Sequence, residues 1–191
     1  MNQEEIMYIQ RSIDQQLLEW KQSSVHKPLL LRGARQVGKS SAIRHLGETF
    51  KHYIEVNFEK RPELKELFEK TSDIHQLAAR LGMLYNVPIE AGKTLVFLDE
   101  IQACPEAIKS LWFFKEDFPE LHVVAAGSLL EFALKELTSY GVGRIRSLFM
   151  YPLSFDEFLQ AQGKASWIEE KRKADHNHPL FEALHQELVQ Q

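Results

Sequence analysis

Cysteine is nearly absent from this sequence, and so are long apolar runs. The one thiol, Cys104, has no second cysteine with which to form an intrachain disulfide. The chain opens with MNQEEIMYIQ, which is acidic and polar where a secretory signal peptide would be basic and then apolar. No apolar stretch approaches the ~18 residues that a membrane-spanning helix requires. These absences predict a protein of the cytoplasm, where thiols stay reduced, without a membrane segment.

The sequence also lacks an excess of positive charge. Its 23 lysines and arginines face 27 acidic residues, which leaves a net charge of −4. The only basic triplet, at 171–173, follows two glutamates and is typical of a solvated helix face. A surface that wraps nucleic acid is therefore not indicated. His176, His178 and His185 have no cysteine or HExxH pattern beside them, which favours a solvated linker over a metal site.

What the sequence does contain is a regular alternation of strand-like and helix-like segments. Strands are expected at residues 29–31, 53–58, 94–98, 122–126 and 147–153. Helices are expected at residues 4–22, 39–50, 61–70, 73–85, 105–117, 129–138 and 180–190. Such alternation predicts a parallel sheet with helices on both faces and ligands bound outside the carboxyl ends of its strands.

The composition changes toward the end of the chain. Residues 160–178 are polar and carry no strand pattern. We therefore divide the chain into a core domain, 1–158, and a helical appendage, 159–191. Within the core domain, Cys104 is expected to be a small packed residue, and Trp112, Phe113 and Phe114 are expected to be buried.

The segment LLLRGARQVGKSSAIRHL contains the pattern G-x-x-x-x-G-K-[ST] where a buried strand passes into a helix. Glycine allows the backbone N–H groups to wrap a phosphate without a side chain in the way. Lys39 reaches the β- and γ-phosphates as a point charge, Ser40 offers a hydroxyl to Mg²⁺, and Ser41 is a further donor to the α-phosphate. The expected nucleotide contacts are Gly33, Ala34, Arg35, Gln36, Val37, Gly38, Lys39, Ser40 and Ser41. Arg35 has two readings, a position over the nucleotide or one in solvent, and we favour solvent.

A second motif, TLVFLDE at 94–100, is an apolar strand that ends in two carboxylates. Asp99 suits the coordination of Mg²⁺, a hard cation that prefers oxygen ligands. Glu100 directly after it is placed to orient and polarise the water that attacks the γ-phosphorus. An apolar run followed by DE is common by chance, so the motif gains weight only together with the phosphate loop.

Two further segments supply candidates for the same site. HVVAAGS ends in Ser128, which faces the γ-phosphate if its strand lies between the first strand and the Asp99 strand. Equally, Ser128 and Glu131 form the capping box of a 129–138 helix. Arg144, on a glycine-containing loop, is placed to stabilise transition-state charge in cis or in a neighbouring subunit. Arg146 is a weaker candidate. The alternative interpretation for both residues is an arginine at the protein surface near a strand edge.

The segments LLLRGARQVGKS, YIEVNFE, LVFLDEIQ, VVAAGSLLEF and GRIRSLFMYPLSFDEFL together resemble a prokaryotic family of AAA+ superfamily ATPases. The resemblance covers about residues 6–160, and PLSFDEFL at 152–159 is its most distinctive part. It implies a three-layer α/β/α P-loop NTPase with a five-stranded parallel sheet of order 5-1-4-3-2. It also implies ATP and Mg²⁺ as ligands, with Lys39 and Ser40 in the phosphate loop.

The resemblance extends to the other motifs and to the end of the chain. It implies that Asp99 and Glu100 form the second motif, that Ser128 is the sensor-type residue, and that Arg144 falls at a recurring arginine. Members usually continue into a second, C-terminal domain, and this chain stops at Gln191, about where that domain would begin. We accordingly expect self-association, or a partner bound through that domain, besides ATP and ADP.

Two functions remain in view from the sequence. The first is an ATPase that hydrolyses ATP to ADP and phosphate to drive a conformational or regulatory process. The second is a nucleotide-gated interaction switch with negligible turnover. A small-molecule kinase is disfavoured because Glu100 would activate water, which a kinase must exclude. A helicase is disfavoured because 191 residues at a net charge of −4 supply neither a second motor domain nor a basic channel.

Overall fold

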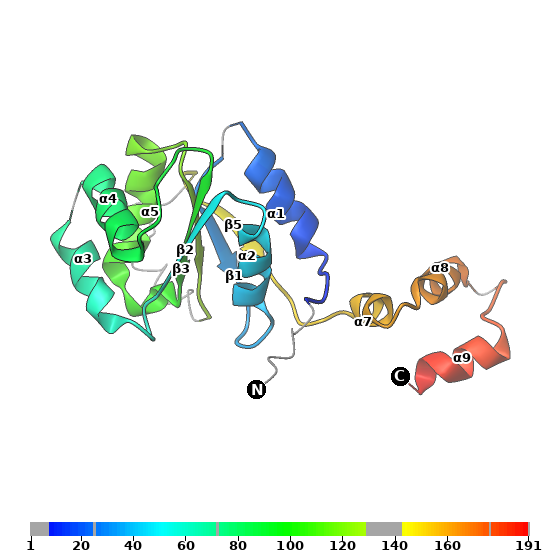
Figure 1. The fold of residues 1–191 in the computed structure, drawn as a ribbon. Coiled ribbons are helices and arrows are strands. Elements are labelled where there is room, and N and C mark those ends of the chain that lie inside the picture. Colours follow the sequence, from blue (N-terminus) through cyan, green and yellow to red (C-terminus); the bar gives the residue numbers. More distant parts are fainter. Residues whose placement is uncertain (1–7, 25, 72, 129–142, 176, 191) are drawn as a thin grey trace. The chain divides into compact units, whose positions relative to one another are not determined.

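The computed structural model describes residues 8–24, 26–71, 73–128, 143–175 and 177–190 (Figure 1). The chain divides into two compact units. The larger is Ile13–Pro152, and the smaller combines Met1–Ser12 with Leu153–Gln191. The predicted division into a core domain, 1–158, and a helical appendage, 159–191, stays a prediction.

Within the described residues, five parallel strands form the centre of the larger unit. They are β1 (Leu29–Arg32), β2 (His52–Asn57), β3 (Thr94–Asp99), β4 (His122–Ala126) and β5 (Arg146–Phe149). Their order is β2-β3-β4-β1-β5, which confirms the predicted order 5-1-4-3-2 read from the opposite edge. Every residue of β3 and β4 is buried, as their continuous apolar runs require in a sheet covered on both faces.

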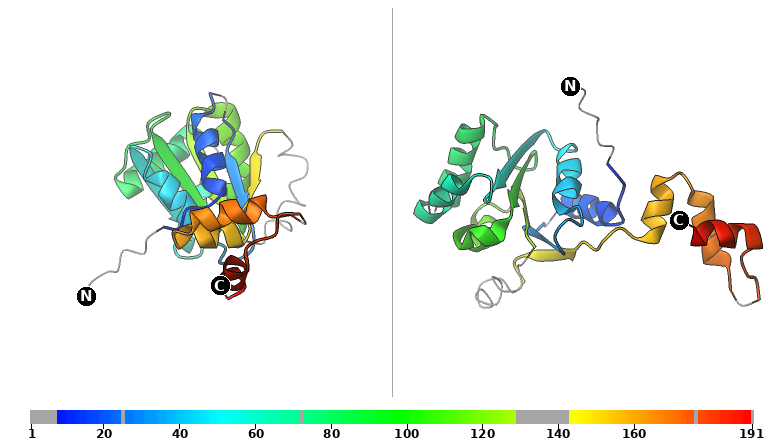
Figure 2. Two further views of the ribbon diagram at one scale, coloured as in Figure 1. Left: turned by 90° about the vertical axis from the view of Figure 1, so that its right-hand side faces the viewer. Right: turned by 90° about the horizontal axis from the view of Figure 1, so that it is seen from below.

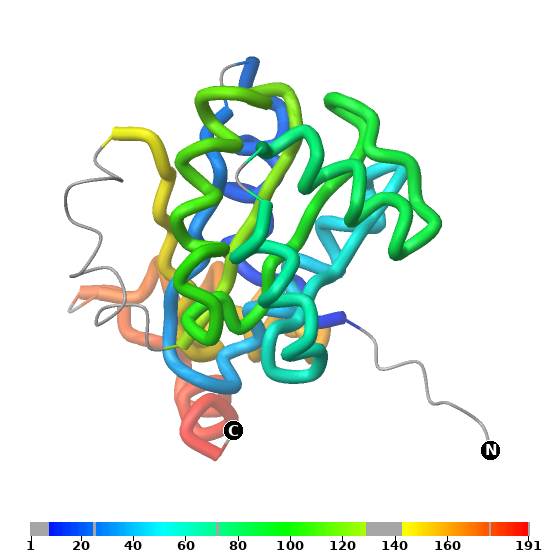
Figure 3. Tube along the Cα trace, turned by 90° about the vertical axis from the view of Figure 1, so that its left-hand side faces the viewer, coloured from blue at the N-terminus to red at the C-terminus, as the bar shows by residue number. Residues whose placement is uncertain are grey.

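Helices cover both faces of this sheet, as Figures 1 and 2 show. On one face lie α1 (Ile13–Gln22) and α2 (Lys39–Gly47). On the other lie α3 (Lys65–Lys70), α4 (Ile74–Tyr85) and α5 (Pro105–Asp117), which are in front of the strands in Figure 3. A large cluster of buried apolar side chains lies between the strands and these three helices, with Phe58, Leu98 and Phe114 among its members. Two short 3₁₀ turns, η1 (Pro62–Leu64) and η2 (Ile101–Ala103), follow β2 and β3.

The register of the sheet assigns each loop to one of two edges. Leu29 is the partner of both Val124 in β4 and Arg146 in β5, so these strands begin at the same edge. At the other edge Asn57 is the partner of Asp99, and Asp99 is the partner of Ala126. The carboxyl ends of β1 to β4 therefore meet at one edge, where the predicted site residues follow each strand.

Two predicted elements are shorter than expected. Of the helix predicted for 4–22, residues 4–7 lie outside the described residues, and the part that follows begins at Ile13. Ile9 before it is 45% exposed, so its apolar spacing does not mark a helical face. The strand predicted for 147–153 ends at Phe149. Its partner β1 ends at Arg32, whose carbonyl accepts a hydrogen bond from the N–H of Met150, and beyond Arg32 the chain turns into the loop that begins at Gly33.

Other details differ more locally. Helix 39–50 ends at Gly47, and helix 61–70 divides into η1 and α3. Cys104 is buried as predicted, but of the aromatic run only Phe114 is, while Phe113 is 37% exposed. Helical periodicity turns Phe113 away from the sheet when it buries Phe114. The predicted 129–138 helix and its capping box with Glu131 lie outside the described residues.

The smaller unit contains α7 (Phe155–Ala161), α8 (Ala165–Lys173) and α9 (Glu182–Val189). Only α9 was predicted, because α7 has only seven residues and α8 is largely polar. None of the described helices combines the length and the apolar composition that a membrane span requires. The basic triplet lies in the last turn of α8, where Lys171 and Arg172 pair with Asp156 at the start of α7.

Glu157 connects the two chain segments of this unit. Its side chain accepts hydrogen bonds from the N–H and hydroxyl of Ser12, at 2.7 and 2.9 Å, and from the N–H of Ser154 at 2.8 Å. Ser154 caps α7 in return, at 3.2 Å from the N–H of Glu157. Burial alone would raise the pKa of Glu157, but these hydrogen bonds and the charge of Arg11 outweigh it and lower the pKa to about 2. The distinctive PLSFDEFL segment thus has a structural role in holding the N-terminal segment.

We expect Glu157→Gln to destabilise the protein in a pH-dependent way. Because one pKa unit corresponds to about 1.4 kcal/mol, the charged carboxylate contributes roughly 3 kcal/mol at pH 7. A lowered pKa gives stability that is complete above the unfolded value, 4.5, and is lost as the pH falls through about 2. Urea titrations of both proteins should differ by about 2–3 kcal/mol at pH 7 and by less than half of that at pH 3.

Glu170→Gln, in which the exposed partner of Lys173 is changed, serves as the control and should alter stability by less than about 0.5 kcal/mol. A difference between wild type and Glu157→Gln that is as large at pH 3 as at pH 7 would contradict the role of the charge.

Candidate functional site

The loop between β1 and α2 has the backbone that its glycines allow. Gly33, Gln36 and Gly38 all have positive φ, at 146°, 61° and 99°. A Cβ on Gly33 would lie 2.2 Å from the carbonyl oxygen of Met150, which follows β5. Gly38 has no side chain to cap the first turn of α2, so the backbone N–H groups there remain for an anion. Ala34, Arg35 and Gln36 are exposed, so the loop is open to a ligand.

Lys39 lies beneath this loop rather than in solvent. It is 9% exposed, and its Nζ donates to the carbonyl oxygens of Gly33 and Ala34 at 2.9 and 2.7 Å. Burial lowers the pKa of Lys39, while the charges of Glu100 and Asp99 act in the opposite direction. A buried ammonium with only carbonyl partners gains a full counter-charge when phosphate oxygens arrive. This cradle therefore fits a phosphate chain.

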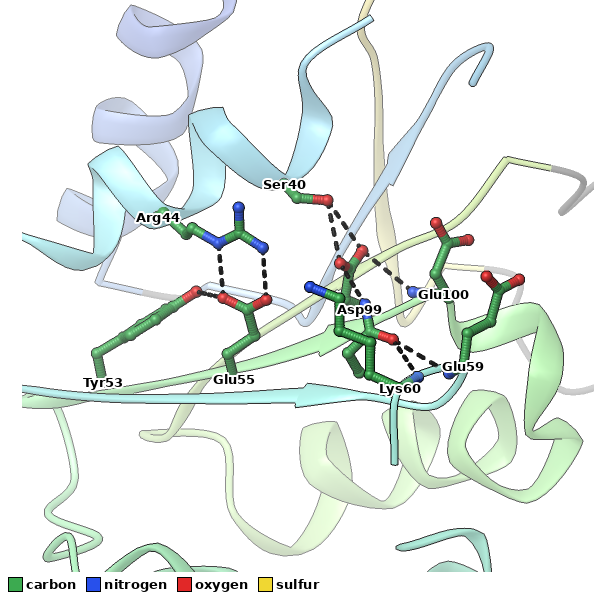
Figure 4. A network of polar contacts seen from close by, with 9 residues as sticks. Ser40, Arg44, Tyr53, Glu55, Glu59, Lys60, Asp99 and Glu100 are labelled. Atoms are coloured by element: carbon green, nitrogen blue, oxygen red, sulfur yellow. Dashed lines mark hydrogen bonds and ion pairs between the residues drawn. The ribbon is translucent and has the colours of Figure 1, made fainter. Parts of the chain in front are cut away.

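Asp99 connects the phosphate loop to the neighbouring strands (Figure 4). The hydroxyl of Ser40 donates to its two carboxylate oxygens, with distances of 3.2 and 3.1 Å. The amide of Asn57, at the end of β2, donates to Oδ2 at 2.9 Å, and the N–H of Glu100 donates to Oδ1 at 3.1 Å. Burial raises the pKa of Asp99, and the hydrogen bonds from Ser40 and Asn57 oppose it. Hydroxyl and carboxylate oxygens at this separation are a donor set that fits Mg²⁺.

Glu100 leaves the end of β3 with a left-handed backbone, φ 51°, which is uncommon for a residue with a side chain. Its Oε2 accepts a hydrogen bond from Nε2 of Gln102 at 2.7 Å. The backbone twist turns its carboxylate away from the buried path of β3, whereas Asp99 before it is 4% exposed. Two adjacent carboxylates thus have different surroundings, one held by hydrogen bonds and one half-buried beside the loop.

Helix α2 is held against the sheet by a second polar network (Figure 4). Arg44 donates two hydrogen bonds to Glu55 in β2, at 2.8 and 2.7 Å, and the hydroxyl of Tyr53 donates a third at 2.9 Å. The hydrogen bonds from Arg44 lower the pKa of Glu55 against the effect of its burial. A bidentate guanidinium–carboxylate pair has a defined geometry. It helps to keep α2, and Ser40 at its start, in register with Asp99.

Ser128 and Arg35 lie at the same edge. Because β4 is placed between β1 and β3, the condition under which Ser128 faces the phosphate loop is met. Nε of Arg35 donates to its Oγ at 3.4 Å, and the guanidinium of Arg35 lies 3.7 Å from Oε1 of Glu59. The side chain of Arg35 is 68% exposed. It nevertheless spans from the loop after β4 to the loop after β2.

Arg144 is not brought to the phosphate loop within one chain. It precedes Arg146, the partner of Leu29, and so lies at the amino edge of the sheet. Its Nε donates to Glu116 on α5 at 2.8 Å, and its guanidinium lies 5.2 Å from the ring centre of Trp112. A role in cis is therefore wrong for this arrangement, because the full length of β1 separates the two ends. Arg146 is at the same amino edge.

Two residues of the site had no predicted role. Asn57 bonds to Asp99 and also accepts hydrogen bonds from the N–H groups of Glu59 and Lys60, at 3.1 and 2.9 Å. In Figure 4 the side chains of Glu59 and Glu100 point the same way from the ends of neighbouring strands. The signal was present in YIEVNFE, where polar residues follow an apolar strand as they do in TLVFLDE.

The comparisons with known proteins agree with this geometry. A protein family described as an AAA domain matches residues 25–159, most of the chain. This chain belongs to that family and is an AAA-type P-loop ATPase domain. The fold is similar to that of the Walker-type ATPase PABY2304 of Pyrococcus abyssi, with a TM-score of 0.52 and 20% identity over 86% of this chain and 59% of that one. No curated protein matches the sequence.

We expect Gly33→Ala to destabilise the chain more than an ordinary glycine substitution does. Alanine at this position would have to keep the positive φ of Gly33. Its Cβ would lie 2.2 Å from the Met150 carbonyl oxygen, so β5 or the loop must move. Strain and overpacking together should cost about 2–4 kcal/mol in a urea titration. Gly92→Ala is the matched control, because Gly92 has φ 71° but no atom within 4 Å of the added Cβ. It should cost only about 1 kcal/mol, and equal losses in the two variants would contradict the close approach.

Proposed function

We propose that this chain is a Mg²⁺-dependent ATPase that converts ATP and water to ADP and phosphate. The observation that carries the proposal is the contact between two separate motifs. Ser40 of the phosphate loop lies 3.1 Å from the Asp99 carboxylate of the second motif, with Lys39 buried beside them. A phosphate cradle, a hard-cation donor set and a neighbouring carboxylate are the parts that phosphoanhydride hydrolysis requires.

The phosphate loop would bind the triphosphate through its backbone and two side chains. Residues 33–38 and the first turn of α2, including Ser41, offer N–H groups. Nζ of Lys39 would donate hydrogen bonds to β- and γ-phosphate oxygens in place of the carbonyl oxygens of Gly33 and Ala34. Ser40 and Asp99 would hold Mg²⁺, which when bound neutralises part of the charge that develops on the phosphates. Asn57 positions Asp99 for that role by fixing one of its oxygens.

Glu100 is assigned as the general base. Its carboxylate orients a water and accepts a proton as the water oxygen bonds to the γ-phosphorus. The bond from that phosphorus to the β–γ bridging oxygen breaks, and ADP leaves with the bonding electrons. Support comes from its position next to Asp99 and from its partly exposed surroundings, since an accessible carboxylate can meet water.

Ser128 is assigned as the residue that senses the γ-phosphate, and Arg35 as its present partner. The hydroxyl oxygen of Ser128 accepts a hydrogen bond from Nε of Arg35 at 3.4 Å. A γ-phosphate offers both groups a stronger, charged partner, so ATP and ADP would leave the loop after β4 in different hydrogen-bonded states. Such a difference is the physical basis on which hydrolysis could be coupled to a conformational or regulatory process.

Arg144 is assigned to the site of a neighbouring copy. Its partner Glu116 and its own side chain are both 45% exposed, and a pair of this kind contributes at most about 1 kcal/mol. Arg144 can therefore leave Glu116 for a developing charge on a phosphate of another chain. Self-association, a partner protein and a cytoplasmic location belong to the same proposal, as does the division into domains 1–158 and 159–191.

We expect Glu100→Gln to abolish phosphate release while ATP stays bound. Loss of a general base should lower turnover by about 10²–10⁴-fold, and the amide preserves the shape of the site. Release of phosphate and binding of a fluorescent ATP analogue, both with Mg²⁺, measure the two effects separately. Glu59→Gln is the matched variant, because Glu59 follows the adjacent strand, and it should keep at least about a tenth of the turnover.

Unchanged phosphate release in Glu100→Gln would remove Glu100 from the mechanism, and a loss confined to Glu59→Gln would transfer the role to Glu59. A wild-type chain that binds ATP with Mg²⁺ and releases no phosphate at any concentration would contradict the ATPase and identify the nucleotide-gated switch.

We expect two inactive variants to restore activity when mixed, if Arg144 acts between copies. Arg144→Ala keeps an intact ATP site without the donated arginine, and Glu100→Gln donates the arginine without a working site. Phosphate release should rise at least about tenfold above either variant alone. Replacing Arg144→Ala by Lys39→Ala in the mixture should give no recovery, since neither chain then has a working site. An absence of recovery in the first mixture, with wild-type turnover independent of concentration, would contradict a role in trans.

A further inference from the structure

A cavity lies at the edge of the sheet opposite the phosphate loop. It has a volume of about 240 Å³ and is placed where β1 and β5 begin, since Leu29 and Arg146 are register partners. Its lining comes from the end of α1, from the residues before β1 and from the start of β5. The lining residues are Trp20, Ser23, His26, Lys27, Ile145 and Arg146. None of the site residues of the ATPase lines it.

The charge of this cavity is of one sign. Lys27 and Arg146 contribute two cations, and none of its described lining residues is acidic. Neither cation forms a side-chain ion pair or hydrogen bond with another residue in the part of the chain that the structure describes. At least eight of the other described lysines and arginines of the larger unit have carboxylate partners, as Arg44 has in Glu55. Two half-buried cations without a counter-ion indicate a place for an anion.

The remaining wall is fixed and incompletely hydrogen-bonded. The ring of His26 stacks on His122 of β4, with centroids 3.8 Å apart and an angle of 9° between the planes. Nε2 of His26 is buried and has no hydrogen-bond partner among the described residues. The indole N–H of Trp20 donates to the carbonyl oxygen of Lys27 at 2.7 Å, which holds the backbone between His26 and β1.

The stacked histidines also decide where the charge lies. Burial, with the neighbouring His26 ring, lowers the pKa of His122 to about 4, so that ring is neutral at neutral pH. The positive charge available to a ligand then comes from Lys27 and Arg146. Trp20 and Ile145 add an apolar surface beside it. One charged side and one apolar side suit a ligand with both characters.

We propose that this cavity binds a small organic anion, with a carboxylate or phosphate group on Lys27 and Arg146 and an apolar part against Trp20 and Ile145. The volume lies below the ~300–1,000 Å³ that drug-sized ligands occupy, so the ligand is small. A guanidinium binds planar carboxylates and phosphates through paired hydrogen bonds, and an ammonium adds a point charge. The site is separate from the ATPase and does not depend on it.

The indole N–H of Trp20 reports on the cavity directly. Its signal in ¹⁵N-correlated NMR spectra is identified by elimination with Trp112→Phe and Trp167→Phe. Benzoate and phenyl phosphate test the two anionic groups, and benzyl alcohol is the neutral ligand of similar size. We expect a saturable shift of the Trp20 signal with benzoate, phenyl phosphate or both, and none with benzyl alcohol at the same concentrations.

Variants then separate the cavity from the phosphate loop. Lys27→Gln and Arg146→Gln should each raise the dissociation constant at least about tenfold, because each removes charge-assisted hydrogen bonds. Lys109→Gln removes a charge on the exposed side of α5 and should leave it unchanged. Lys39→Ala, which impairs the phosphate loop, should also leave the Trp20 response unchanged, whereas it should weaken ATP binding. Two Gln variants allow the test to proceed if one of them does not fold.

The proposal is overturned if neither anion gives a saturable shift. It is equally overturned if benzyl alcohol binds as tightly as benzoate, since the cavity would then be merely apolar, or if neither Lys27→Gln nor Arg146→Gln weakens binding. Loss of the Trp20 response in Lys39→Ala would show that the shift originates at the phosphate loop and would also contradict it.

Discussion

The buried carboxylate of Asp99 is the point on which the candidate site depends. It accepts hydrogen bonds from Ser40 after β1, from Asn57 at the end of β2 and from the backbone of Glu100 after β3. Burial disfavours its charged form, and these donors offset part of that cost. The three loops are therefore fixed relative to one another before any ligand is present, which reduces the ordering that a nucleotide must bring about.

Sheet order explains which of the candidate residues can share that site. Parallel strands place all their carboxyl ends at one edge, and the order β2-β3-β4-β1-β5 puts β4 between the phosphate loop and the second motif. Ser128 consequently lies at the same edge of the sheet as the phosphate loop, and Arg144 does not, although both follow or precede apolar strands in the sequence. Arg144 sits at the entrance of β5, and the direction of that strand alone sends it to the opposite edge.

Most of the fold could be predicted from the sequence because its signals are local. Buried parallel strands are continuous apolar runs, and β3 and β4 follow their predicted ranges to within one residue. The phosphate loop was predicted because glycine is needed where φ is positive, as at Gly33 and Gly38. Contacts between segments that are distant in the sequence could not be predicted from such local signals. Asn57 and Glu59 gain their positions only from pairing with β3, and Glu157 only from Ser12, 145 residues away.

The two elements whose predicted lengths were wrong also have local causes. Apolar spacing in the N-terminal segment continued past the residue where the helix begins, because Ile9 lies in a different compact unit from Ile13. The strand predicted for 147–153 was too long. An apolar run indicates how many residues are buried, but it does not indicate where the neighbouring strand ends. The pairing of β5 stops where β1 turns into the phosphate loop.

The turn from β1 into the phosphate loop keeps both β1 and its partner β5 short. Both β1 and β5 contain four residues, so they span only about 13 Å between the phosphate loop and the cationic cavity. At the loop end Gly33 abuts the Met150 carbonyl so closely that a single methyl group would not fit. At the cavity end Lys27 and Arg146 flank the same two strands. The hydrogen-bonded pair of β1 and β5 thus connects the two edges of the sheet, and Leu29 with Arg146 at one end is followed by Arg32 with Phe149 at the other.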